Sequence, residues 1–260
     1  MASVPPAAAA LPRVLIVGDS VSLGFTPFLA ELLADEATVE RPPAELFTGG
    51  VSNCGDTERG AAEIASWLGR SDEQRWDAVH FQFGLHDICY RRPAAESGGS
   101  THGEWRTFRA DRAVAVPEWE ETRLFFHDDK DGGQQSVPLP RYVSNLRSIV
   151  AQLRAGAPAA ELCWASTTVV PPDEPGRKAG EEIDFNAAAA EVMAEQGVAI
   201  NDLHRLTSAF EPALFRAPGD VHFTDEGSLL IAQQVAAHIR EALARKKMQQ
   251  QRQRPTAARI

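Results

Sequence analysis

Residues 13–20 read RVLIVGDS, and this stretch decides the fold. The run from Arg13 to Val17 is apolar and rich in β-branched residues, which is typical of a buried strand. Gly18 and Asp19 then make a small turn, and Ser20 stands at the start of the next segment. In that segment apolar side chains recur at helical spacing: Leu23, Phe28, Leu29, Leu32 and Leu33. A strand that turns directly into a helix is the first half of a strand–helix–strand unit.

The same alternation continues along the chain. Further strands are predicted at residues 38–41, 78–83, 161–166 and 198–201, and amphipathic helices are predicted between them. A final helix begins near Thr224 or Asp225. Five strands separated by helices predict an α/β fold, a parallel sheet with helices on both faces. We expect this domain to cover residues 13–244.

One segment interrupts the alternation, and we interpret residues 91–139 as an insertion after the third strand. A hairpin is predicted in it, with strands at 123–126 and 134–137 joined by a turn at 128–133. The cluster of His127, Asp128, Asp129 and Asp131 fits an acidic turn better than a metal site, because its spacing matches no calcium-binding loop. The insertion is either a lid or substrate-binding wall, or a surface decoration.

Composition excludes several classes of protein. With 43% hydrophobic and 24% charged residues, the chain has the balance of a globular protein rather than a disordered one. There is no apolar run of the length that crosses a membrane. The three cysteines, Cys54, Cys89 and Cys163, are too few for a disulfide framework, and no Cys/His spacing suggests zinc. We therefore expect a soluble, cytoplasmic protein with no metal and no cofactor.

The two ends of the chain differ from the body. Residues 1–12 are rich in Ala and Pro and lack the cationic start of a signal peptide, so we expect a disordered lead-in. Residues 245–260 hold six cations and no acids, and we expect a basic flexible tail. Since the net charge is −10, the rest of the chain carries about −16, which would repel a phosphate backbone. Neither nucleic acid nor a membrane is an expected partner.

Polar clusters follow the predicted strands where a parallel sheet binds ligands, outside the carboxyl ends of its strands. Gly18-Asp19-Ser20 follows the first strand, Gly84-Leu85-His86-Asp87 follows the third, and Gly219-Asp220-Val221-His222 precedes the last helix. A serine nucleophile needs a base, and a histidine base needs a group that orients its ring.

We therefore predict Ser20 as nucleophile, His222 as base and Asp220 as the orienting acid. Backbone N–H groups at a helix start, here that of Ser20, are suited to stabilise the oxyanion. Gly55 lets the backbone approach a ligand closely.

Taken together, these motifs resemble the SGNH hydrolases, the GDSL-type esterases and lipases, over nearly the whole chain from Val14 to Ile239. The resemblance implies a flavodoxin-like three-layer sandwich. The family is recognised by a series of short sequence blocks, and His86 lies in the part of this chain that resembles the third of them. The resemblance also implies an oxyanion hole formed by Ser20, Gly55 and His86. Val221-His222-Phe223-Thr224 looks like the family's last block.

The chain departs from the family pattern in two places. The third block of the family reads Gly-x-Asn-Asp, whereas this chain has His86 in place of Asn, as in a subset that carries Gly-Leu-His-Asp. An imidazole N–H can still donate to an oxyanion. The family also places its acid three residues before the histidine, where this chain has Gly219. Either a bulge brings Asp220 to His222, or the site is a Ser–His dyad with a backbone carbonyl orienting the ring.

Other polar and aromatic side chains are secondary candidates. The expected substrate-binding residues are Asp19, Asp87, Trp164, Thr167 and Thr168. His204 is a reserve candidate for the base, and His80 is expected to be a core residue with its hydrogen bonds satisfied.

The sequence thus predicts a serine ester hydrolase that removes a short acyl group, acetyl above all, from a carbohydrate or other polar alcohol through an acyl-enzyme. The expected partner is a small-molecule or glycan ester. The alternative is a catalytically silent module that binds a glycan or acyl ligand in the same cleft. A phosphate or nucleotide binder is less consistent with the sequence, which has no glycine-rich phosphate loop with a lysine.

Overall fold

The computed structural model describes residues 10–42, 53–69, 76–93 and 126–253. Its centre is a five-stranded parallel sheet in the order β2-β1-β3-β7-β8. The strands are β1 (Arg13–Val17), β2 (Thr38–Glu40), β3 (Ala78–Gln82), β7 (Glu161–Ala165) and β8 (Ala199–Asn201). The chain starts inside the sheet, moves out through β2, and returns past β1 to build the other side. This flavodoxin-like order confirms the predicted fold class.

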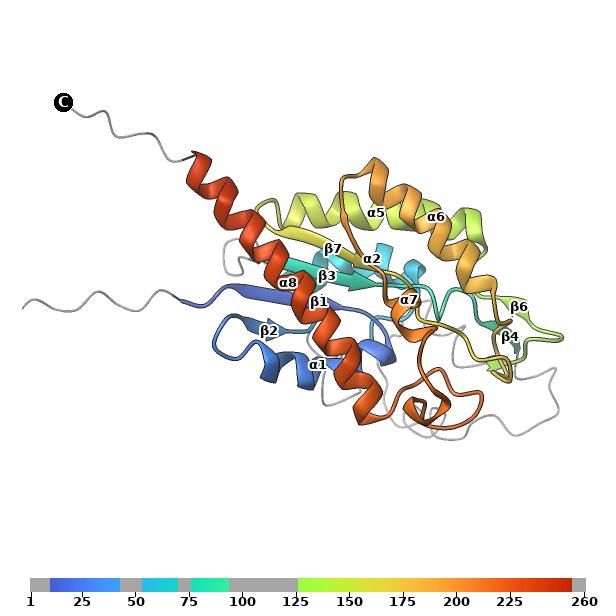
Figure 1. Ribbon diagram of the computed structural model, residues 1–260. Helices are drawn as coiled ribbons and strands as arrows, with labels where there is room; N and C mark the ends of the chain where they lie inside the picture. Colours follow the sequence, from blue (N-terminus) through green and yellow to red (C-terminus); the bar gives the residue numbers. More distant parts are fainter. Residues whose placement is uncertain (1–9, 43–52, 70–75, 94–125, 254–260) are drawn as a thin grey trace, which may run out of the picture.

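Helices cover both faces of the sheet, as Figure 1 shows. One layer consists of α1 (Ser20–Leu32) and α8 (Asp225–Gln253), which pack against each other. The other contains α2 (Thr57–Trp67), α5 (Leu139–Gly156) and α6 (Glu181–Glu195), with α5 between its two neighbours. A short helix, α7 (Leu203–Thr207), and a 3₁₀ turn, η2 (Pro212–Leu214), connect β8 to α8.

Strand β1 illustrates why the sequence adopts this fold. Val14, Leu15, Ile16 and Val17 are all fully buried, because alternate side chains meet a helix layer on each face of the sheet. Asp19 then ends the strand–turn segment and caps α1, since its carboxylate accepts a hydrogen bond from the Val21 N–H at 3.0 Å. The first helix therefore starts at Ser20.

The insertion after β3 differs from the predicted hairpin. It contains a three-stranded antiparallel sheet in the order β5-β4-β6, formed by β4 (Tyr90–Pro93), β5 (Phe126–Asp128) and β6 (Gln134–Gln135). Residues 123–125 of the first expected strand lie outside the described residues, and β5 runs from Phe126 to Asp128, where the prediction ended that strand and began the turn. β5 and β6 are not neighbours in this sheet, because β4 lies between them and pairs with both. Residues 94–125 lie outside the described residues, so the lid remains a prediction.

The end of α8 corrects a second expectation. Residues 245–253, predicted to begin a flexible tail, continue the helix. Lys246 is buried and its ammonium lies 2.7 Å from the Asp77 carboxylate, while Arg245 pairs with Glu161 at 3.3 Å. These two ion pairs hold this part of α8 against the domain. Residues 1–9 and 254–260 lie outside the described residues.

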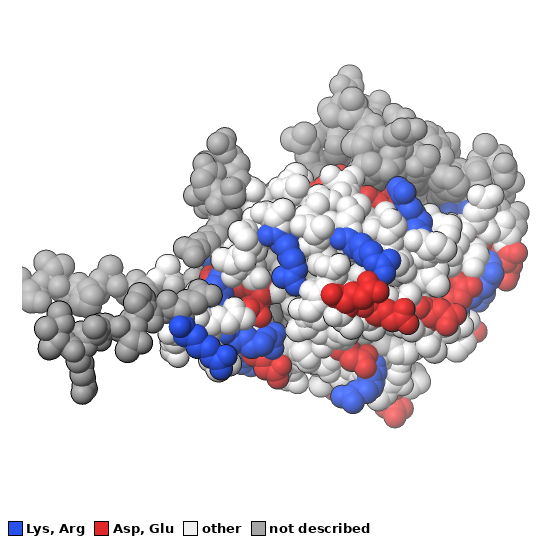
Figure 2. Space-filling model, turned by 90° about the horizontal axis from the view of Figure 1, so that it is seen from above, with Lys and Arg blue, Asp and Glu red and all other residues white. Residues whose placement is uncertain are grey.

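The charges on the face formed by α5 and α6 are mixed in sign. Figure 2 shows basic and acidic side chains side by side there, and Arg147 of α5 pairs with Glu195 of α6 at 2.8 Å. None of the helices in the described part of the chain has the length and apolar character needed to span a membrane.

Candidate active site

Ser20, His222 and Asp220 form a hydrogen-bonded chain at the carboxyl edge of the sheet. His222 Nε2 lies 2.7 Å from Ser20 Oγ, although 202 residues separate the two in sequence. His222 Nδ1 lies 2.6 Å from Asp220 Oδ1. With the proton on Nδ1, the ring donates to the carboxylate and can accept the Ser20 proton on Nε2. The structure thus brings together the three residues that the sequence predicted to cooperate.

Asp220 reaches the imidazole from two residues away because the chain bends tightly before His222. The same oxygen, Asp220 Oδ1, also accepts the backbone N–H of His222 at 2.9 Å. Gly219 has φ +76°, a left-handed conformation that favours glycine. This bend places the Asp220 carboxylate beside the ring, and the Nδ1 partner is a side chain rather than a backbone carbonyl.

The turn that carries Ser20 is tied to its neighbours. The Gly18 carbonyl accepts a hydrogen bond from the Cys54 N–H at 3.0 Å and from Arg41 Nη2 at 2.9 Å. Arg41 Nη1 also donates to Ser22 Oγ at 2.8 Å. A side chain at Gly18 would collide with Ser22, because an added Cβ would lie 2.8 Å from its Oγ. These contacts tie the residues on either side of Ser20 to neighbouring segments, and Ser20 itself is half-buried.

Gly55, the expected second oxyanion donor, lies buried at φ +67°. Its N–H donates to Asn53 Oδ1 at 3.1 Å, in a turn closed by the asparagine side chain. An oxyanion would have to share or replace that bond. This contact could have been predicted from the sequence, since an asparagine two residues before a glycine is typical of such turns.

His86 lies half-buried in the turn that follows β3. The Ile88 N–H donates to the Gly84 carbonyl at 2.9 Å and closes this turn. Gly84 packs so closely on Thr167 that any Cβ would overlap its side chain. Thr167 is therefore part of the support of the turn, and its hydroxyl donates to the Phe83 carbonyl at 3.1 Å.

All five of the expected substrate-binding residues are buried. Asp19 and Asp87 are both 0% exposed. Asp87 Oδ1 accepts the Thr57 N–H at 3.0 Å and its hydroxyl at 2.5 Å, which joins the turn after β3 to the start of α2. Trp164 and Thr168 are also buried, as is Thr167. In this structure these side chains contact the protein, and their role toward a substrate stays a prediction.

Two further histidines of the described residues, His204 and His80, have partners away from Ser20. His204 Nε2 lies 3.4 Å from Glu182 Oε1, so the reserve candidate for the base has a different carboxylate partner. His80 is fully buried in β3, and its Nε2 accepts a hydrogen bond from Asn201 Nδ2 at 3.2 Å. Its Nδ1 has no partner in the described part of the chain, so the expected full satisfaction of this ring is only half met.

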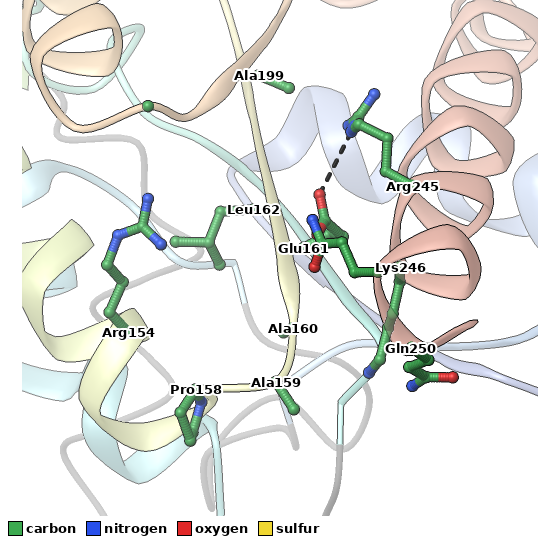
Figure 3. A pocket seen from close by; sticks show the side chains of 12 residues that line it. Arg154, Pro158, Ala159, Ala160, Glu161, Leu162, Ala199, Arg245, Lys246 and Gln250 are labelled. Carbon is green, nitrogen blue, oxygen red and sulfur yellow. Dashed lines mark hydrogen bonds and ion pairs between the residues drawn. The ribbon is translucent and has the colours of Figure 1, made fainter. Parts of the chain in front are cut away.

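A cavity of about 630 Å³ opens at the opposite, amino edge of β7 and β8 (Figure 3). Arg154, Glu161, Arg245 and Lys246 are among the residues that line it. Arg245 and Glu161 are already paired with each other, as the dashed contact between them shows. The cavity lacks the nucleophile and base found at the carboxyl edge, so its size alone does not make it the reaction site.

Fold and site together define the class. The protein has a flavodoxin-like α/β fold, and hydrogen bonds link a serine, a histidine and an aspartate at the carboxyl edge of its sheet. Residues 16–230 match the sequence model of the GDSL-like lipase/acylhydrolase family. The chain therefore belongs to this family of hydrolases, as the resemblance implied. No curated protein sequence matches the chain.

Solved structures with the same fold include a lipase/acylhydrolase from Enterococcus faecalis, with a TM-score of 0.58 at 15% identity over 90% of this chain and 97% of the other. An acetyl xylan esterase, AlAXEase, has a TM-score of 0.56 at 11% identity over 87% of this chain and 99% of the other. The acetylxylan esterase Axe2 from Geobacillus stearothermophilus has a TM-score of 0.55 at 13% identity over 88% and 94%. At these identities the likeness concerns the fold.

Proposed function

We propose that the protein is a serine ester hydrolase that removes a short acyl group from a carbohydrate or other polar alcohol. The observation that carries this proposal is the chain of hydrogen bonds from Ser20 through His222 to Asp220, at 2.7 and 2.6 Å. A serine hydroxyl is a weak nucleophile unless a base takes its proton as it attacks. His222 is within reach of that proton, and a carboxylate stabilises the imidazolium that forms.

The reaction follows from this geometry in two stages. Ser20 Oγ attacks the ester carbonyl while His222 Nε2 takes its proton, and the tetrahedral intermediate places negative charge on the carbonyl oxygen. His222 then gives the proton to the leaving alcohol, and the acyl group stays on Ser20. Water attacks this acyl-enzyme with His222 again acting as base, which releases the acid and restores the serine.

The proposed oxyanion donors are the backbone N–H groups of Ser20 and Gly55 and the side chain of His86. The Ser20 N–H stands at the first position of α1, where backbone donors have no partner within the helix. Asp19 and Asp87 are buried, and we propose that they hold these donors in place. With His86 in the position where the family has Asn, we also propose that the chain belongs to the subset with Gly-Leu-His-Asp.

Acetyl is the proposed acyl group. Two proteins with the same fold bear the names of acetyl xylan esterases, and a carbohydrate acetyl ester is therefore the first substrate to test. A series of p-nitrophenyl esters of increasing chain length, followed by acetylated sugars, should show the highest kcat/KM for the acetyl member. A preference for long chains would contradict this part of the proposal.

Covalent labelling by a fluorophosphonate tests the enzyme against the binding module. Only an activated serine reacts, so the wild-type protein should be labelled at Ser20 and the Ser20→Ala variant should not. An unlabelled wild-type protein that binds acetylated sugars without hydrolysing them would instead identify a silent binding module.

A further inference from the structure

Residues 173–177, in the connection between β7 and α6, contact the turn that carries His86. Arg177 is only 7% exposed, and its Nε donates to the Leu85 carbonyl at 2.6 Å. Leu85 directly precedes His86. A charged donor on this carbonyl is a strong, directional contact, and it fixes the peptide plane from which His86 projects.

The same segment supports the turn that carries Asp220 and His222. Gly219 packs on Asp173 so closely that an added Cβ would lie 2.6 Å from the Asp173 carbonyl oxygen. The bend at Gly219 therefore rests on backbone atoms of the first residue after the Pro171-Pro172 pair. A shift of residues 173–177 would therefore displace both the turn that carries His86 and the turn that carries His222.

Arg177 also acts electrostatically on the turn of Ser20. Burial raises the pKa of Asp19, and the nearby Arg177 guanidinium acts in the opposite direction. Arg177 thus acts through its charge on the residue before the nucleophile, and through a hydrogen bond on the residue before His86.

Glu174 holds Arg177 in this position. Its Oε1 lies 2.6 Å from Arg177 Nη1, and its Oε2 accepts the Gly176 N–H at 2.8 Å. The backbone around them is docked on the insertion, because the Tyr90 N–H donates to the Gly176 carbonyl at 2.6 Å. A buried ion pair contributes little net stability compared with apolar packing. Here the pair places the Arg177 guanidinium between the Glu174 carboxylate and the Leu85 carbonyl.

We propose that Arg177, held by Glu174, is a positioning residue of the active site. It sets the turn of His86 relative to the turns of Ser20 and His222, and so aligns the oxyanion donor with the nucleophile and base. The inference rests on the proposed function and adds to it a residue that the sequence motifs do not contain. Since displacement of catalytic groups by about 1 Å can cost about 10²-fold in rate, loss of this alignment should lower kcat more than it changes KM.

The test compares Arg177→Met with Lys246→Met. Lys246 is a matched control, because it too is a buried cation, with its ammonium 2.7 Å from Asp77 and 3.3 Å from the Trp76 carbonyl. It lines the cavity at the opposite edge of the sheet (Figure 3). Both variants remove one buried cation from an ion pair, so both should lower the melting temperature.

Kinetics are measured on folded protein, checked by circular dichroism, with an acetyl ester. We expect Arg177→Met to lower kcat by about 30-fold or more with KM within about threefold, and Lys246→Met to leave kcat within about twofold. Arg177→Lys keeps the charge but not the planar guanidinium that binds the Leu85 carbonyl and Glu174 at the same time. Its kcat should therefore lie between those of the wild-type protein and Arg177→Met. Glu174→Gln should reduce kcat in the same way, and the two milder variants decide the question if Arg177→Met does not fold.

The outcomes separate this inference from the proposed function. Equal, small kcat losses in the Arg177 and Lys246 variants of an active enzyme would overturn the positioning role and leave the esterase intact. A rise in KM alone would assign Arg177 to substrate binding instead. A wild-type protein without esterase activity or fluorophosphonate labelling would overturn the proposed function, and the positioning role with it.

Discussion

At the scale of single residues, the acid departs from the family pattern, because Asp220 stands two residues before His222 and not three. Gly219 stands where the family has its aspartate, and it can hold no side chain, because φ is +76° and Asp173 lies against it. Asp220 takes over the contact by bonding both the backbone N–H and the ring of His222. Of the two alternatives left open by the sequence, the arrangement favours the triad over the dyad.

This arrangement predicts the effect of removing the acid. Asp220→Asn should lower kcat by about 10²- to 10⁴-fold, because the amide cannot stabilise the imidazolium and favours the wrong tautomer. The double variant Gly219→Asp/Asp220→Gly places the acid where the family has it. This variant should be as impaired as Asp220→Asn, since the new side chain at position 219 would collide with Asp173. Steady-state kinetics beside the exposed control Glu226→Gln measures both effects. A loss below about threefold for Asp220→Asn would support the dyad.

The nucleophile and base should act as one unit. Ser20→Ala and His222→Ala should each lower kcat by several orders of magnitude, and the double variant should be little worse than either, as in other serine enzymes. Single-turnover assays on the three variants give the comparison. Losses that multiply in the double variant, or a Ser20→Ala protein that keeps a tenth of the activity, would be incompatible with the assignment.

His86 can be tested by its two roles. If its side chain donates to the oxyanion, His86→Ala should lose about 10²-fold in kcat with little change in KM, and His86→Asn should keep much of the activity. If it only holds the turn after β3, His86→Ala should instead lower stability by about 1–3 kcal/mol and leave kcat nearly unchanged. Melting temperature and kcat measured on the same variants distinguish the two.

At the scale of elements, local patterns predicted the central sheet, because β1, β3 and β7 are short, mostly buried runs bounded by turn residues. The edge strand β2 is a weaker pattern, Thr38–Glu40, which two prolines follow. Local patterns did not predict the pairing of residues 126–135, because β4 is a polar segment, Tyr90-Arg91-Arg92-Pro93, whose role as a middle strand depends on distant partners. The same holds for the candidate site. Ser20, His222 and Asp220 stand in recognisable motifs, whereas Arg177 and Glu174 reach the site only through the folded path of the chain.

The end of α8 gives an element-scale prediction. A chain ending at Ala244 loses the contacts of Lys246 with Asp77 and of Arg245 with Glu161. It should therefore melt at a lower temperature than a chain ending at Gln253, which keeps α8 complete. Calorimetry on the two truncations makes the comparison. Equal melting temperatures would mean that residues 245–253 behave as the tail that their composition suggested.

At the scale of the whole molecule, the buried His80 links stability to pH. It is 0% exposed between the sheet and α1, where Phe25 meets its ring edge-on at 6.2 Å between centroids. Burial lowers the pKa of His80 to about 3 from 6.5, with a smaller contribution from His238. Between these two values the unfolded chain binds a proton that the folded protein does not. The free energy of unfolding therefore falls as the pH drops from about 6.5 toward 3, and the contribution of a neutral His80 is complete above about 6.5.

Replacing this ring by a side chain that does not titrate should remove that dependence. Each pH unit in this range is worth about 1.4 kcal/mol, so from pH 7 to pH 5 the wild-type protein should lose about 2 kcal/mol more than His80→Gln. The amide side chain would pack less well than the imidazole, so His80→Gln is expected to be less stable at pH 7, and the pH dependence of stability, not its absolute value, carries the test. Urea unfolding of both proteins at several pH values measures that dependence. Proton NMR of the His80 ring in the folded protein gives a direct check, and a titration midpoint between about pH 5 and 7 would show that water reaches the interior of the sheet.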